Sequence, residues 1–174
     1  SSFQGEATRE APKAPTPAST ATPAFAEVVL QFGEKGIGHG QFTNAHLSGL
    51  DGDGRLYVAE YVGGRVQVFD QTGKFLNQFY VADKKASVDG LAVDRAGVLY
   101  VTDGTDITRW DGKTGKALGK LKYSGGPGFG ELMLAPDGTL YAMWYERRSG
   151  LFTSVEGARE DLVHFDSDGQ VISV

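Results

Sequence analysis

The stretch "LDGDGRLYVAEYVGGRVQVFDQTGKF" (residues 50–75) contains two runs of alternating apolar and polar residues, each bounded by glycine-rich turns. Alternation with a period of two is typical of half-buried strands, and Asp-Gly and Gly-Gly pairs favour tight hairpin turns. The run "DGRLYVAE" (53–60) returns as "AGVLYVTD" (96–103) and "DGTLYAMW" (137–144), so that Gly54, Gly97 and Gly138 lie 43 and 41 residues apart. The stretch is therefore one copy of a repeated unit.

A second series of motifs follows the first at each copy: "VQVFDQTGK" (66–74), "ITRWDGKTGK" (107–116) and "LVHFDSDGQ" (162–170). In the first unit we expect four strands, at residues 45–50, 56–60, 65–70 and 74–80. A lone sheet of this size leaves apolar residues on both faces, so each copy needs neighbours packed face to face. A four-stranded unit that recurs about every 40 residues predicts an all-β fold, the β-propeller.

These motifs resemble the NHL-repeat family of β-propellers. The resemblance rests on "GHGQF" (38–42), "DGRLYVAE", "GRVQVFD" (64–70) and "GKF" (73–75), and it covers roughly residues 28–174. It implies about three blades of four antiparallel strands, at residues 33–81, 82–123 and 124–174, preceded by an outer strand at 27–32. The second copy departs from the pattern at "TDITRWD", and the third carries about 14 additional residues between its second and third strands.

Three blades are fewer than the four to eight with which propellers generally close, and members of the resembled family are commonly six-bladed. Three blades alone leave two apolar faces. We expect either a piece of a longer chain that holds the missing blades, or two copies joined head to tail into a six-bladed ring. In the ring, residues 27–32 would complete a blade of the partner.

Charge and composition exclude several partners. The net charge is -5, and Lys and Arg are scattered, so there is no basic surface for nucleic acid. No run of about 18 apolar residues is present, which argues against direct membrane insertion. The chain has no cysteine, which removes disulfides and thiolate metal sites.

Residues 1–26 are rich in Pro, Ala and Thr, and we interpret them as a disordered linker. A propeller on such a tether is similar to the sensor portion of bacterial receptor-type kinases. This resemblance implies an extracytoplasmic or cell-envelope location.

Two groups of residues are candidates for a binding site. Counting from the turn glycines places one group at the mouth of the central channel: His46, Glu60, Asp89, Asp103 and Trp144. The insertion "WYERRSGLFTSVEGARED" (144–161) supplies the second, because aromatic and arginine side chains are enriched in protein interfaces: Tyr145, Arg147, Arg148 and Phe152.

No catalytic motif defined by spacing is present, so the sequence predicts a non-enzymatic module that binds a protein or other ligand without a cofactor. One alternative is a lyase or lactonase that uses a divalent metal in the channel, held by His46, Glu60, Asp89 and Asp103. The other alternative is a purely structural assembly module.

Overall fold

The computed structural model describes residues 26–81, 87–146 and 156–174. Its strands form three four-stranded antiparallel sheets, each in sequence order, which confirms the prediction of all-β propeller blades. Blade 1 consists of β3 (Ala45–Leu50), β4 (Leu56–Glu60), β5 (Arg65–Phe69) and β6 (Phe75–Tyr80). Blade 2 consists of β7 (Gly90–Val93), β8 (Val98–Thr102), β9 (Ile107–Asp111) and β10 (Ala117–Lys120). Blade 3 consists of β11 (Gly128–Leu134), β12 (Leu140–Tyr145), β13 (Glu160–Phe165) and β14 (Val171–Ser173).

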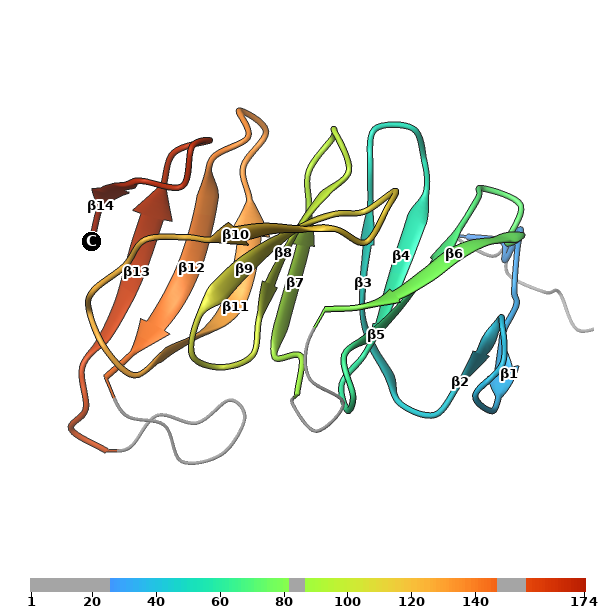
Figure 1. The fold of residues 1–174 in the computed structure, drawn as a ribbon, viewed down its shortest axis with the longest axis horizontal. Coiled ribbons are helices and arrows are strands. Elements are labelled where there is room, and N and C mark those ends of the chain that lie inside the picture. Colours follow the sequence, from blue (N-terminus) through green and yellow to red (C-terminus); the bar gives the residue numbers. More distant parts are fainter. Residues whose placement is uncertain (1–25, 82–86, 147–155) are drawn as a thin grey trace, which may run out of the picture.

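The blades lie side by side in chain order, and Figure 1 shows blade 2 between the other two. The first strand of each blade is innermost, because β7 contacts both β3 and β11. The inner strands approach closely where they carry glycine. A Cβ atom on Gly90 of β7 would lie 2.5 Å from the carbonyl oxygen of Gly130 on β11. One on Gly128, at the start of β11, would fall on the carbonyl oxygen of Gly104, in the turn between β8 and β9. Glycine inside a strand is typical of such close backbone approach.

Alternation along the strands divides the core into two layers. We call the face of a blade toward the following blade its leading face, and the opposite face its trailing face. The layer between blades 1 and 2 is built on buried side chains: Tyr57, Ala59, Val66, Val68, Val81, Val88, Leu91, Leu99 and Val101. The layer between blades 2 and 3 is built in the same way: Ala92, Tyr100, Ile107, Leu121, Phe129, Leu140, Ala142, Trp144, Val163 and Phe165. Each blade is thus stabilised mainly by burial against its neighbour.

A short segment before blade 1, residues 32–43, packs on the trailing face of that blade; we call it the lead-in segment. Its strands β1 (Glu34–Lys35) and β2 (Gln41–Phe42) pair with each other in parallel. The rings of Phe32 and Phe42 contact Phe69, at centroid distances of 4.9 and 6.0 Å. The lead-in segment therefore covers aromatic surface that would otherwise face solvent.

Residues 27–32 form no strand in the single chain, so the outer strand expected there stays a prediction. Val28 and Val29 are 77% and 93% exposed. A strand needs a hydrogen-bonding neighbour, and within the described residues the structure pairs no strand with this segment. The predicted linker, apart from residue 26, lies outside the described residues.

The same contact recurs where each blade meets the segment that precedes it. The turn between the third and fourth strands holds a glycine with positive φ in every blade: Gly73 (+81°), Gly115 (+70°) and Gly169 (+81°). A Cβ atom on Gly115 would meet Phe79, from the end of blade 1, and one on Gly169 would meet Leu121, which follows β10. A Cβ atom on Gly73 would lie 3.0 Å from the ring of Phe32. Phe32 thus occupies the place that the end of a preceding blade fills elsewhere.

Candidate functional site

Glu60, predicted at the channel mouth, lies at the end of β4 and is only 4% exposed. One carboxylate oxygen accepts a hydrogen bond from Arg65 Nε at 2.5 Å. The other accepts bonds from the backbone N–H of Thr43 (2.6 Å), from its hydroxyl (2.9 Å) and from the backbone N–H of Asn44 (3.2 Å). The carboxylate therefore ties the end of β4 to the chain that enters β3.

Arg65 completes this arrangement from β5. Its Nη1 and Nη2 atoms donate to the carbonyl oxygens of Ile37 (2.6 Å) and Gln41 (2.8 Å) in the lead-in segment. Burial opposes ionisation of Glu60, but the bonds from Arg65, Thr43 and Asn44 outweigh it and lower the pKa of Glu60 from 4.5 to about 2. The pair is a buried structural clamp, charged at neutral pH.

Asp89 and Asp103 flank blade 2 at the same end of the strands. Asp89 is buried directly before β7, and its backbone N–H donates to Thr102 at 2.8 Å. Asp103 is exposed, and its carboxylate accepts the backbone N–H groups of Thr105 (3.0 Å) and Asp106 (3.2 Å). An aspartate that bonds the backbone two residues on is typical of turn formation.

His46 is exposed on β3, with its ring 5.5 Å from the ring of Tyr61. It lines a hollow of about 220 Å³ together with Ala45, Leu47, Ser48 and Val58. In the described parts of the chain, no three His, Asp or Glu side chains are grouped closely enough to hold a metal ion. The residues proposed for a channel metal are thus not brought together as one group.

Trp144 and Tyr145 do not reach the solvent as the sequence suggested. Trp144 is 4% exposed within the core between blades 2 and 3, and its ring packs edge-on against Tyr123 at 6.2 Å. The guanidinium of Arg159 covers it from outside, 5.6 Å from the ring centre. Tyr145 is also buried, and its hydroxyl donates to Glu131 at 2.8 Å. The other three insertion residues, Arg147, Arg148 and Phe152, lie outside the described residues.

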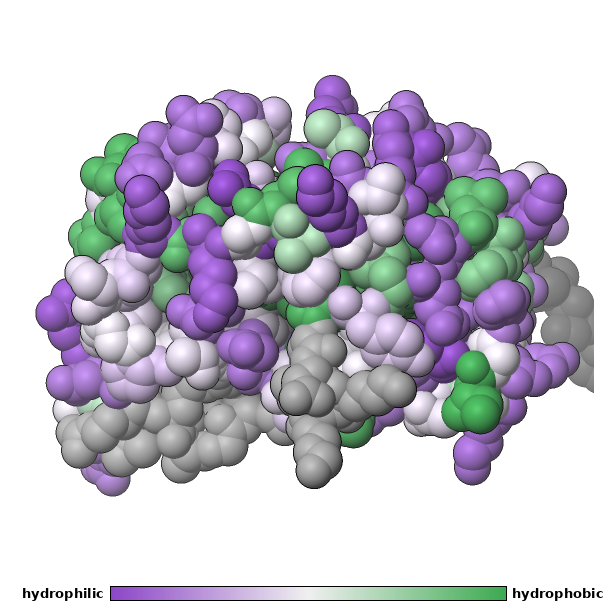
Figure 2. All heavy atoms as spheres, in the orientation of Figure 1, coloured by the Kyte–Doolittle hydropathy of each residue, from purple (hydrophilic) through white to green (hydrophobic). Residues whose placement is uncertain are grey.

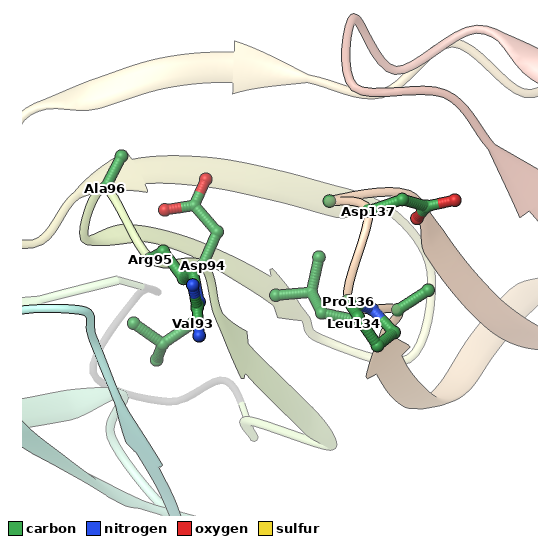
Figure 3. A pocket seen from close by; sticks show the side chains of 9 residues that line it. Val93, Asp94, Arg95, Ala96, Leu134, Pro136 and Asp137 are labelled. Atoms are coloured by element: carbon green, nitrogen blue, oxygen red, sulfur yellow. The ribbon is translucent and has the colours of Figure 1, made fainter.

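At the opposite end of the strands, a hollow of about 580 Å³ separates two hairpin turns, residues 93–96 of blade 2 and 134–138 of blade 3. Figure 3 shows Asp94 on one side of it and Asp137 on the other. The Asp94 carboxylate accepts the N–H of Val98 (2.8 Å), and that of Asp137 accepts the N–H of Thr139 (3.0 Å). Both carboxylates therefore cap their own turns, and sequence reasoning had not placed a site here.

The leading face of blade 3 is a surface on which no other described blade packs. Its side chains are those of Met133, Tyr141, Met143, Leu162 and His164. Tyr141 and His164 are cross-strand partners whose rings stack at 4.0 Å. Met133 and Leu162 are 62% and 50% exposed. Figure 2 shows hydrophobic side chains gathered at this end, over β13 and β14. A surface group of exposed apolar side chains is typical of an interaction site.

The repeat identifies what this face lacks. Tyr141 stands where Tyr57 and Tyr100 stand in blades 1 and 2, and those two are 0% and 6% exposed beneath the following blade. Leu162 stands where Val66 and Ile107 stand, which are almost completely buried. The signal was present in the sequence, because the three motifs align residue for residue.

Comparison with known proteins supports the architecture. No protein-family profile matches the chain, and no curated protein matches it. Among solved structures, hydrazine synthase of Kuenenia stuttgartiensis aligns with a TM-score of 0.55 and 22% identity, over 72% of this chain and 35% of that one. A streptogramin B lyase aligns with a TM-score of 0.53 and 18% identity, over 74% and 39%. A gluconolactonase of Xanthomonas campestris aligns with a TM-score of 0.50 and 22% identity, over 71% and 44%.

These similar structures are β-propeller-like proteins, and at such identities the likeness concerns the fold alone. The chain spans less than half the length of each. None of the described residues belongs to a helix long and apolar enough to cross a membrane.

Proposed function

We propose that this chain is a non-catalytic, NHL-like propeller module that binds another polypeptide through the leading face of blade 3. The observation that carries the proposal is the contrast between equivalent side chains: Val66 and Ile107 are buried, whereas Leu162 is 50% exposed. Burying apolar side chains is the main source of association energy. A face built like two buried ones, but open, suits a protein partner better than a small polar ligand.

Two of the four residues proposed for a channel metal have structural tasks. Glu60 is held by Arg65 and the lead-in segment, and Asp103 bonds its own turn. A general acid or metal ligand needs a carboxylate that can change partners. This use of the carboxylates supports a binding role, and the extracytoplasmic sensor role is the part of the proposal that rests on residues 1–26.

The binding face is tested by photo-cross-linking in cells. A benzophenone amino acid at position 162 is expected to give adducts with a polypeptide, because Leu162 lies on the proposed face. Position 118 is the matched control, since Leu118 is 44% exposed on β10, at the outer edge of blade 2. Equal adduct yields from the two positions would contradict the proposal.

The lyase or lactonase alternative has a separate test. Purified protein is incubated with zinc or calcium and then desalted. We expect it to retain at most about 0.1 equivalent of metal per chain. The expected reason is that Glu60 is already occupied by Arg65 and Thr43. Stoichiometric metal that is lost on His46→Ala, measured by elemental analysis, would favour the enzyme instead.

A further inference from the structure

We propose that the polypeptide bound by blade 3 is a second copy of this chain, and that residues 27–32 of each copy form the outer strand of blade 3 in the other. The inference rests on the proposed function, because it names the partner of the same face. Blade 3 of each copy packs against blade 1 of the other. The two identical interfaces close the assembly as a ring of two chains.

The first step is the complementarity of the two end faces of one chain. In both core layers of the chain, the leading face of one blade packs on the trailing face of the next. The leading face of blade 3 is built like those two leading faces. The trailing face of blade 1 already carries its lead-in segment, with Ile37 82% exposed. Joining these faces repeats, for a third time, an interface that the chain builds twice within itself.

The second step concerns Phe32. It contacts Gly73 as Phe79 contacts Gly115, and both phenylalanines follow a glutamine, Gln31 and Gln78. In blade 1 the Gln-Phe pair belongs to β6, the outer strand. Residues 27–32 are therefore placed as the outer strand of whichever blade precedes blade 1.

The third step concerns the outer edge of β13 among the described residues. In blade 1, β6 pairs with all of β5, from Arg65 opposite Tyr80 to Phe69 opposite Phe75. In blade 3, β14 pairs with β13 only at His164 and Phe165, which lie opposite Ser173 and Val171. By the register of blade 1, Phe32 of a second copy would lie opposite Leu162, as Phe79 lies opposite Val66. The entering segment would displace the three-residue β14 and pair along the strand.

Strand addition of this kind draws affinity from backbone hydrogen bonds and specificity from alternate side chains. Val28 and Val29 are exposed in the single chain and would gain burial on pairing.

The first experiment measures mass by light scattering during size exclusion. Purified full chain is expected at twice 18.6 kDa, about 37 kDa. Leu162→Arg, which buries a charge in the interface, and Val29→Pro, which removes a strand N–H, are each expected to weaken dimerisation at least about tenfold. Both sites are exposed in the single chain, so the variants should keep its circular dichroism spectrum. Leu118→Arg is the control and should remain dimeric.

The second experiment tests register, using the absence of native cysteine. When Leu162→Cys and Phe32→Cys are mixed and oxidised, a disulfide-linked heterodimer is expected, because opposed residues of paired strands lie within bonding reach. The mixture of Leu118→Cys with Phe32→Cys should give no more than random cross-linking.

A mass of 18.6 kDa up to millimolar concentration overturns the inference, as does a dimer that survives both Leu162→Arg and Val29→Pro. Species that grow beyond the dimer overturn the closed ring, because an interface whose rotation does not close forms open chains. If the purified chain is monomeric while position 162 cross-links to a different polypeptide in cells, the inference fails and the proposed function stands. If neither occurs, both fail.

Discussion

Replacing Arg65 by methionine is expected to lower the free energy of unfolding by about 3–5 kcal/mol, measured by chemical denaturation. The change leaves the Glu60 carboxylate buried without its cation, and Glu60 is 4% exposed. It also removes the donors to the carbonyl oxygens of Ile37 and Gln41. The lead-in segment should then detach from blade 1, which near-ultraviolet circular dichroism of its aromatic residues would report.

Lys120→Met is the matched control, because Lys120 also pairs with a carboxylate, that of Asp106, but at the surface. Exposed pairs contribute about 0–1 kcal/mol, so this variant should unfold close to wild type. A loss for Arg65→Met no larger than that for Lys120→Met would contradict the clamp.

The same clamp predicts a dependence on pH. The pKa of Glu60 is about 2 in the folded chain and 4.5 in its ordinary state. Because the folded pKa is the lower one, the stabilisation is fully present above pH 4.5 and is lost as the pH falls toward 2. The difference corresponds to about 3 kcal/mol. In Glu60→Gln this part of the acid sensitivity should disappear, and an unchanged acid profile would contradict the assignment.

Gly128→Ala is expected to have the second largest effect, a loss of about 3 kcal/mol or more in the free energy of unfolding. Its new methyl group would fall on the backbone carbonyl oxygen of Gly104, which is not the movable end of a side chain. The start of β11 would have to move away from the turn between β8 and β9 of blade 2. Increased fluorescence quenching of Trp144, buried between blades 2 and 3, would locate the damage when it is measured in a Trp110→Phe background.

Gly138→Ala is the companion variant. Gly138 has a φ of +87° and open space around its Cβ position, so alanine there costs only backbone strain, about 1–2 kcal/mol. If Gly138→Ala proved as damaging as Gly128→Ala, the close contact between Gly128 and the turn at Gly104 would not be the cause.

The strands were predictable because hairpin turns and alternation are local signals. The expected strand at residues 45–50 matches β3, and that at 56–60 matches β4. Turn chemistry fixes such registers without knowledge of the rest of the chain. Residues 27–32 differ, because an outer strand depends on a partner strand that local sequence cannot supply.

The candidate site was predicted less well, because the sequence does not show what covers the strand face on which each side chain lies. Counting from the turn glycines correctly places Glu60 and Trp144 at equivalent positions. Side chains on a strand alternate between its two faces, and both of these residues lie on the trailing face, against Thr43 and Tyr123 respectively. Position along a strand was thus predictable, whereas the segment that covers its side chain was set by tertiary packing.

In the single chain, blade 2 has neighbours on both sides, since β7 contacts β3 and β11. Stability in such a row is a sum of nearest-neighbour terms, so the end units fray before the middle one. Slow amide exchange should therefore concentrate in β8 and β9. A closed ring has no end units, and its formation would make exchange uniform around the circle.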